Sequence, residues 1–136
     1  MKIKFKVWDR IDKDMIDWVT LSQSAFNRDG LNIVYDVLMN HENRYAHLLY
    51  SLLNDMYDKE ICEGDILKAR DNMSYKFSPV GVVQYDSQYG GLIVIDCNSF
   101  YELLTIDVAS DSEIIGNIYE NPELLESENV ECQTKY

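Results

Sequence analysis

Four aspartates near the N-terminus have the residue type and spacing closest to those of a metal site. Asp9, Asp12, Asp14 and Asp17 follow one another at intervals of two or three residues, and calcium loops use closely spaced carboxylates in this way. Such a loop also needs a glycine at its sixth position and a bidentate glutamate at its end, and the sequence has neither at the required spacing. We therefore interpret the run as a polar hairpin turn and expect no metal ligand in it.

The histidines and cysteines do not form a site pattern either. His41 and His47 are six residues apart, on different faces of a helix, and neither belongs to an H-E-x-x-H sequence. The three cysteines, Cys62, Cys97 and Cys132, have no C-x-x-C spacing. An odd number of widely spaced cysteines argues against a zinc site and against a disulfide framework. We therefore expect the protein to reside in a reducing cytoplasm.

Signatures of catalysis are also missing from the sequence. It has no G-x-S-x-G elbow, no Walker loop and no G-x-G-x-x-G fingerprint. Cys62 adjoins Glu63, and an acidic neighbourhood disfavours the thiolate that nucleophilic catalysis requires. The 24 carboxylates form many pairs, but spacing cannot select an acid and a base among them. We therefore predict a non-enzymatic protein with no catalytic residue, no metal-binding residue and no cofactor.

The charge of the chain is strongly acidic and unevenly distributed. The net charge is −12, and residues 1–76 contribute −2 of it, with 13 acidic and 11 basic residues. Residues 77–136 contribute −10, because 11 acidic residues stand against Lys135 alone. This half cannot supply the cations that neutralise phosphates, so we do not expect nucleic acid as a partner.

The sequence contains no candidate targeting or membrane segment. Five charged residues fall within the first ten positions, which leaves no apolar stretch for a signal segment. No later run reaches the roughly 18 apolar residues that a membrane-spanning helix needs. We expect a cytoplasmic protein that does not contact a membrane.

Alternating and turn-forming residues predict a β-hairpin at the N-terminus. Lys2 to Trp8 alternates polar and apolar side chains, as a half-buried strand does. Asp9 to Asp14 supplies a polar turn, and Met15 to Leu21 resumes an apolar-rich strand pattern. A second turn at Asn27 to Gly30 leads to a strand over Leu31 to Met39.

The pattern that follows this strand is helical. An apolar stripe at helical spacing predicts an amphipathic helix over Glu42 to Tyr57 and consists of Tyr45, Leu49, Leu52, Leu53 and Met56. The apolar stripe of this helix would be wide enough to pack on a sheet.

Short strands separated by turns dominate the second half of the sequence. Glu63-Gly64-Asp65 predicts a tight turn in which Gly64 takes the strained backbone and Asp65 binds nearby amides, before a strand begins at Ile66. Three further strand patterns follow, namely Val80 to Tyr85, Gly91 to Cys97 and Phe100 to Val108. Strands at this spacing predict a small, strongly bent antiparallel barrel.

A bulge and a helix start are predicted near the C-terminus. Glu113 to Tyr119 has a strand pattern interrupted at Gly116-Asn117, where the missing side chain suits a bulge or a close backbone approach. Asn121 as a cap and Pro122 at the first helical position predict a short helix. Residues 126–136 are polar and acidic, so we expect a frayed tail.

Three blocks of the sequence resemble the YopX family of bacteriophage and prophage proteins. They are Ile3 to Asp9 (IKFKVWD), Glu60 to Leu67 (EICEGDIL) and Glu113 to Leu125 (EIIGNIYENPELL). The resemblance implies a mainly β protein in which an N-terminal β element precedes an SH3-like barrel over about Ile61 to Leu125. It also implies a phage or prophage origin, a bacterial host and relatives that form oligomers, but no particular reaction. The structural motif residues that we single out in these blocks are Gly64, Asp65, Gly116, Asn117, Tyr119, Asn121 and Pro122.

The resemblance disagrees with the helix expected in the middle of the chain. Relatives carry a strand-like Gln-Tyr-Thr-Gly-Leu there, followed by a turn that contains glycine. This chain has Leu52 in place of the first glycine and Tyr57-Asp58 in place of Asn-Gly. Both departures favour a longer helix, and a strand is the alternative over 42–57.

The expected fold class is mainly β, or α+β at most. Residues 1–59 form a β-hairpin or meander element with the helix over 42–57, residues 60–125 form the SH3-like small barrel with a short helix at its end, and residues 126–136 form the tail.

We expect a phage or prophage accessory protein that acts through protein association, most simply as a homo-oligomer that uses strand edges and exposed aromatic side chains. The alternative is an acidic inhibitor that occupies the basic, nucleic-acid-binding surface of a host protein. A weaker alternative is a nucleic-acid-binding module that uses Lys2, Lys4, Lys6 and Arg10.

Overall fold

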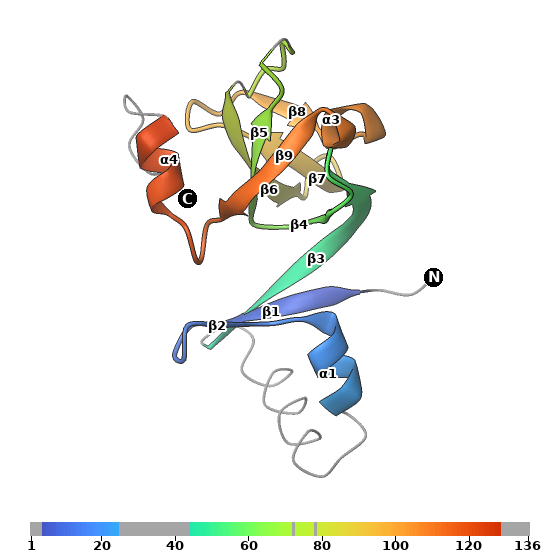
Figure 1. Cartoon of the computed structure of the whole chain (residues 1–136), viewed down its shortest axis with the longest axis vertical. Coiled ribbons are helices and arrows are strands. Elements are labelled where there is room, and N and C mark those ends of the chain that lie inside the picture. The colour runs from blue at the N-terminus through green and yellow to red at the C-terminus, as the bar shows by residue number, and fades with distance from the viewer. Residues whose placement is uncertain (1–3, 25–43, 72, 78, 129–136) are drawn as a thin grey trace. The chain divides into compact units, whose positions relative to one another are not determined.

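A computed structural model describes residues 4–24, 44–71, 73–77 and 79–128 (Figure 1). The chain separates into two compact units, an N-terminal unit, Met1–Tyr50, and a C-terminal unit, Ser51–Tyr136. Within the described ranges the strands are β1 (Phe5–Asp9), β2 (Asp14–Ile16), β3 (Tyr45–Asn54), β4 (Glu60–Cys62), β5 (Asp65–Ala69), β6 (Val80–Asp86), β7 (Gly91–Ile95), β8 (Tyr101–Leu103) and β9 (Ser112–Asn117). The helices are α1 (Trp18–Ser24), α3 (Ile106–Ser110) and α4 (Glu123–Glu128).

The N-terminal unit contains the predicted hairpin. β1 pairs antiparallel with β2, with Val7 opposite Ile16, and with the first half of β3. The second strand of the hairpin is shorter than predicted, because α1 begins at Trp18. The reason is a local cap: the Asp17 carboxylate accepts a 2.7 Å hydrogen bond from the backbone N–H of Thr20, as a helix N-cap does.

Three aspartates of the run, Asp9, Asp12 and Asp14, lie at the turn of this hairpin, as predicted, whereas Asp17 caps α1. Asp9 is buried, and its Oδ1 accepts hydrogen bonds from the backbone N–H groups of Ile11 and Asp12. Arg44 Nη2 lies 2.9 Å from Asp9 Oδ2 and 3.2 Å from Asp12 Oδ2. The hydrogen bond from Arg44 is the main reason that the pKa of Asp9 lies below its ordinary value.

The helix predicted over 42–57 is wrong for the residues that β3 contains, and the strand alternative is right. Pairing with β1, in which Phe5 lies opposite Leu49, supplies backbone partners that helical spacing alone does not reveal. Leu52 adopts φ 66° and Asp58 adopts φ 64°, the left-handed backbone that glycine favours. These are the two positions at which the resembling family carries glycine.

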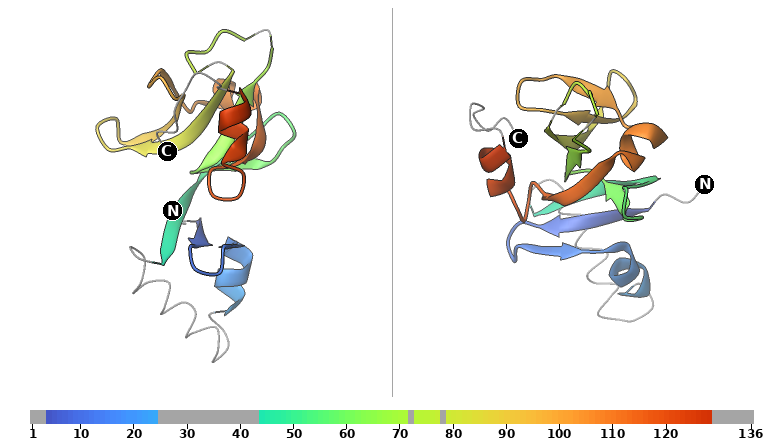
Figure 2. Two further views of the ribbon diagram at one scale, coloured as in Figure 1. Left: turned by 90° about the vertical axis from the view of Figure 1, so that its left-hand side faces the viewer. Right: turned by 45° about the horizontal axis from the view of Figure 1, so that its top comes forward.

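The C-terminal unit is built on a five-stranded antiparallel sheet with the order β8-β7-β6-β5-β9. The sheet curls into a half-barrel, as expected for an SH3-like small barrel (Figures 1 and 2). The strand predicted over Phe100 to Val108 is too long, because α3 begins at Ile106. The Thr105 side chain caps this helix by accepting a hydrogen bond from the Val108 N–H.

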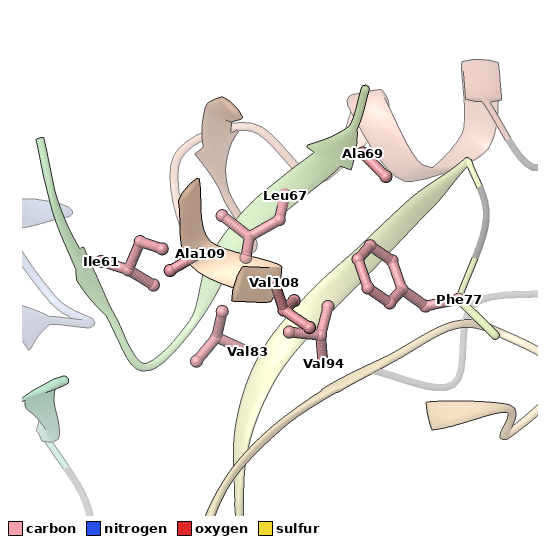
Figure 3. Packing of buried hydrophobic residues seen from close by; sticks show 8 residues of the cluster. All are labelled: Ile61, Leu67, Ala69, Phe77, Val83, Val94, Val108 and Ala109. Carbon is pink, nitrogen blue, oxygen red and sulfur yellow. The ribbon is translucent and has the colours of Figure 1, made fainter. Parts of the chain in front are cut away.

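Two apolar clusters hold the sheet. The inner cluster fills the concave face, where side chains from four strands, the 73–77 loop and α3 point toward one another (Figure 3). It consists of Ile61, Leu67, Ala69, Phe77, Val83, Val94, Val108 and Ala109. On the other face, Leu125 of α4 packs with Ile66, Val80 and Val82. The short C-terminal helix is therefore confirmed and covers part of the convex face.

Several expectations lie outside the described residues. They are the turn at Asn27 to Gly30, the strand over Leu31 to Met39, and the tail beyond residue 128. Among the helices of the described ranges, none has the length and apolar character to span a membrane.

Candidate protein-association site

The motif residues that the sequence singled out lie side by side in the C-terminal unit. Asp65 is opposite Asn117 in the β5–β9 pair, and the Ile118 N–H donates a 2.9 Å hydrogen bond to the Gly64 carbonyl oxygen. Gly64 has φ 90°, and the buried Asp65 carboxylate accepts a 2.7 Å hydrogen bond from the Cys62 N–H. These contacts agree with the predicted turn chemistry and give the two sequence blocks a common structural role.

The third block, Glu113 to Leu125, forms close contacts within itself. The register between β5 and β9 shifts next to Gly116, which is the predicted bulge. A Cβ atom at Gly116 would lie 2.7 Å from Asn121 Oδ1 and 2.8 Å from Leu124 Cδ1, so the backbone approaches these side chains closely. Asn117 Oδ1 accepts hydrogen bonds from the N–H groups of Tyr119 and Glu120, and α4 begins directly after Pro122. The motif residues thus fix the junction between β9 and α4.

Many carboxylates of the C-terminal unit act as acceptors within turns. Asp55 Oδ1 accepts from the N–H groups of Tyr57 and Lys59. Asp86 and Asp96 each accept two backbone N–H groups in the same way. Aspartate is frequent at such positions because its short side chain can close a turn on the backbone. Part of the acidic excess therefore has a structural role.

The histidines and cysteines take separate positions. The His47 ring packs on the Phe5 ring at a centroid distance of 5.6 Å, while His41 and Cys132 lie outside the described residues. Cys62 is buried and is not part of a disulfide, whereas Cys97 is disulfide-bonded, which departs from the expectation that the cysteines form no disulfide framework. Within the described ranges no three histidine, cysteine or acidic side chains gather in a way that could hold a metal ion.

A cavity of about 270 Å³ opens beside β5 and β9. Its charged lining consists of two cations, Lys68 and Arg70, and two carboxylates, Asp71 and Glu113. Lys68 lies opposite Glu113 in the strand pair. Because cations and carboxylates are equal in number, the cavity has no net charge with which to select an anion or a cation.

Exposed aromatic side chains are the most conspicuous surface feature of the C-terminal unit. They are Tyr57, Tyr85, Tyr89, Phe100 and Tyr101. Each has about half or more of its surface exposed, between 47% and 63%. The sequence could not separate these side chains from buried ones such as Phe77, since the distinction depends on the register of the sheet. Aromatic side chains with large exposed areas are typical of protein interfaces.

The two edges of the five-stranded sheet differ. At the β9 edge, the Ile114 N–H donates a 3.0 Å hydrogen bond to Asp55 Oδ2, and the Met56 N–H donates a 2.9 Å bond to the Ser112 carbonyl oxygen. This edge is therefore occupied by the β3–β4 turn. The β8 edge begins with Tyr101, which follows Phe100, and both residues are among the exposed aromatic side chains. An exposed edge next to exposed aromatic rings is the arrangement best suited to bind another polypeptide.

Comparison with known proteins supports the fold. The model of a family described as YopX protein matches residues 4–126. The chain is also similar to the solved structure described as protein EF1440 from Enterococcus faecalis, with 23% sequence identity and a TM-score of 0.58. This similarity covers 93% of the chain and 99% of the other chain and shows a shared fold. No curated protein matches the chain.

Proposed function

The chain belongs to the YopX family, and from this we propose that it is a phage or prophage accessory protein that acts in the bacterial cytoplasm through protein association. The simplest form of this association is a homo-oligomer. No reaction is part of the proposal, because it rests on surfaces and not on a catalytic arrangement.

The exposed aromatic side chains carry this proposal. Among the described residues of the C-terminal unit, five aromatic side chains are about half or more exposed, and two of them, Phe100 and Tyr101, lie at the β8 end of the sheet. Rings of this kind lose water-exposed area and gain packing contacts when a partner covers them. Association of copies would cover them without a second gene product.

The molecular mass in solution tests the proposal. Sedimentation equilibrium from low to high micromolar concentrations should give a mass above that of the 15.9 kDa chain. A chain that stays strictly monomeric over this concentration range would contradict the proposal.

A second candidate is an acidic inhibitor of a basic host protein. The observation that favours it is the absence of lysine and arginine between Phe77 and Thr134. An acidic surface attracts a basic surface of a DNA-binding protein and competes with phosphate for it. This candidate requires capture of a host partner that weakens steeply with added salt, because exposed charge pairs are screened. Salt-insensitive capture would contradict it.

Direct nucleic-acid binding is the weakest candidate. Lys6 lies on β1 and Lys4 directly precedes this strand. The Lys4 Nζ lies 4.5 Å from the centroid of the Tyr50 ring. A net charge of −12 opposes the approach of a polyanion. If a gel-shift experiment at low salt shows no shifted nucleic-acid band, this candidate is wrong.

A further inference from the structure

We propose that two copies of this chain pair through their β8 strands, antiparallel, across a twofold axis beside Tyr101. The inference rests on the proposed association and names the surface that performs it. The two half-barrel sheets would then continue into one sheet across the interface.

The backbone of Tyr101 faces away from its own sheet. In an antiparallel pair, successive residues point their N–H and C=O groups alternately toward and away from the neighbouring strand. The Asp96 N–H donates to the Phe100 carbonyl oxygen, and the Leu104 N–H donates to the Leu92 carbonyl oxygen. Residues 100, 102 and 104 therefore face β7, and Tyr101, which lies between them, presents its N–H and its carbonyl oxygen outward.

Within the described residues this edge has no lysine, proline, bulge or covering segment to limit pairing between chains, although β8 is short and carries the inward-pointing Glu102. Proteins protect exposed edges with lysine, proline, bulges or covering segments. In the described residues, β9 is covered by the β3–β4 turn through Asp55 and Met56. β8 has the sequence Tyr-Glu-Leu, without lysine or proline, and its register with β7 is regular. β8 is thus the less protected of the two edges.

Charge is low at β8 although the chain is acidic. From Cys97 to Ile106 the sole charged residue is Glu102. The Glu102 carboxylate lies on the inner side of the sheet, where its Oε1 accepts a 3.1 Å hydrogen bond from the Lys76 N–H. A second copy can therefore approach this strand against less repulsion than elsewhere on the surface.

The same carboxylate selects the register. If Glu102 lay on the twofold axis, it would face its own copy, and like charges directly opposite each other destabilise a strand pair. With Tyr101 on the axis, Glu102 lies opposite the uncharged Phe100 of the other copy. The two Tyr101 residues then exchange both backbone hydrogen bonds, and their rings, each 47% exposed, meet on one face of the sheet.

Variants at Tyr101 test the pairing. Tyr101→Pro removes the outward N–H, and proline is tolerated on an edge strand where the N–H faces solvent. Tyr101→Lys keeps that N–H but brings two like charges together on the axis. Both should weaken association by at least about tenfold, as loss of a central interface residue does. Gln88→Lys, at an exposed and non-aromatic position on the β6–β7 turn, adds the same positive charge away from the edge and should leave association unchanged.

The outcomes separate this inference from the proposed function. Association of both Tyr101 variants as strong as that of the wild-type chain would overturn the β8 pairing while leaving the proposed function intact. A monomeric wild-type chain would overturn both. Exchange of the Tyr101 amide hydrogen in the wild-type chain gives a test without substitution. It should slow as the concentration rises, and fast exchange in the associated form would overturn the pairing.

Discussion

The Asp55 carboxylate and the backbone N–H of Ile114 are joined by a 3.0 Å hydrogen bond across 59 residues of sequence. Asp55 is 5% exposed, and its other oxygen accepts two N–H groups within its own turn, those of Tyr57 and Lys59. One side chain therefore shapes the β3–β4 turn and attaches it to the edge of β9.

Replacement of Asp55 should destabilise the C-terminal unit. Asp55→Ala leaves three backbone donors without this acceptor, and we expect a loss of about 2–3 kcal/mol in the free energy of unfolding. Asp86→Ala is the matched control, because Asp86 accepts two N–H groups in an exposed turn where water can replace it. It should cost about 1 kcal/mol or less. Urea unfolding followed by circular dichroism measures both, and equal losses would contradict the role of Asp55 at β9.

Leu52 adopts a backbone conformation that leucine disfavours, and its replacement by glycine should stabilise the protein. Its φ is 66° and its side chain is 67% exposed, so little packing is lost with it. The left-handed backbone conformation costs a residue with a Cβ atom about 1–2 kcal/mol. Glycine avoids this cost but loses more conformational entropy on folding, which offsets part of the gain. We expect Leu52→Gly to gain about 0.5–1 kcal/mol. Leu52→Ala keeps the Cβ atom and should gain nothing, so a similar gain in both variants would argue against backbone strain.

This residue also explains why the sequence pattern failed in the middle of the chain. A glycine at position 52 would have marked a break in any helix, whereas leucine completed an apolar stripe at helical spacing. The strand forms because β1 pairs with it, and such long-range pairing overrides local preference. The family resemblance gave the correct alternative because relatives keep the glycine.

Turns were easier to predict than helix starts or surfaces. Gly64 and Asp65 act through residues close to them in sequence, so their chemistry was visible in the sequence. Asp17 and Thr105 are equally local caps, but each lies within a strand-like pattern that masks its helix signal. The exposure of Tyr101 could not be predicted, because it depends on which strand ends the sheet.

Gly116 should be intolerant of any side chain. A Cβ atom there would lie under 3.0 Å from Asn121 and Leu124, so β9 and α4 would have to separate. We expect Gly116→Ala to destabilise the C-terminal unit by about 1–3 kcal/mol, as overpacking does. In Gly91→Ala the new Cβ atom would meet nothing closer than 3.5 Å, which makes it the control on another strand. Thermal unfolding of both variants checks this, and an unchanged melting temperature for Gly116→Ala would refute the close approach.

Tyr75 should make stability depend on pH in the alkaline range. Its hydroxyl donates a 2.6 Å hydrogen bond to Asp111 Oδ2, and this bond is the main reason that the pKa of Tyr75 is raised from 10.0 to about 12. A raised pKa means that the folded state holds the proton more tightly. The contribution is therefore complete below pH 10 and disappears as the pH rises toward 12. The midpoint of urea unfolding should therefore decrease between pH 10 and pH 12. Tyr75→Phe should make this decrease smaller, whereas Tyr89→Phe, in an exposed turn, should not. An identical alkaline decline in Tyr75→Phe would count against the bond.

Asp9 should make the N-terminal unit sensitive to acid. Its pKa is lowered, first by the hydrogen bond from Arg44, so the folded state favours the ionised carboxylate. The contribution is thus complete above the ordinary value of 3.8 and disappears as the pH falls through the lower folded value. The two tryptophans of the chain, Trp8 and Trp18, lie in this unit, so tryptophan emission reports its unfolding. Arg44→Gln should make the unfolding midpoint decrease less steeply as the pH falls. Asp14→Asn, an exposed change in the same hairpin, should leave this decrease as steep as in the wild-type chain. If the unfolding midpoint of Arg44→Gln decreases as steeply at acid pH as that of the wild-type chain, the ion pair is not the source of the acid sensitivity.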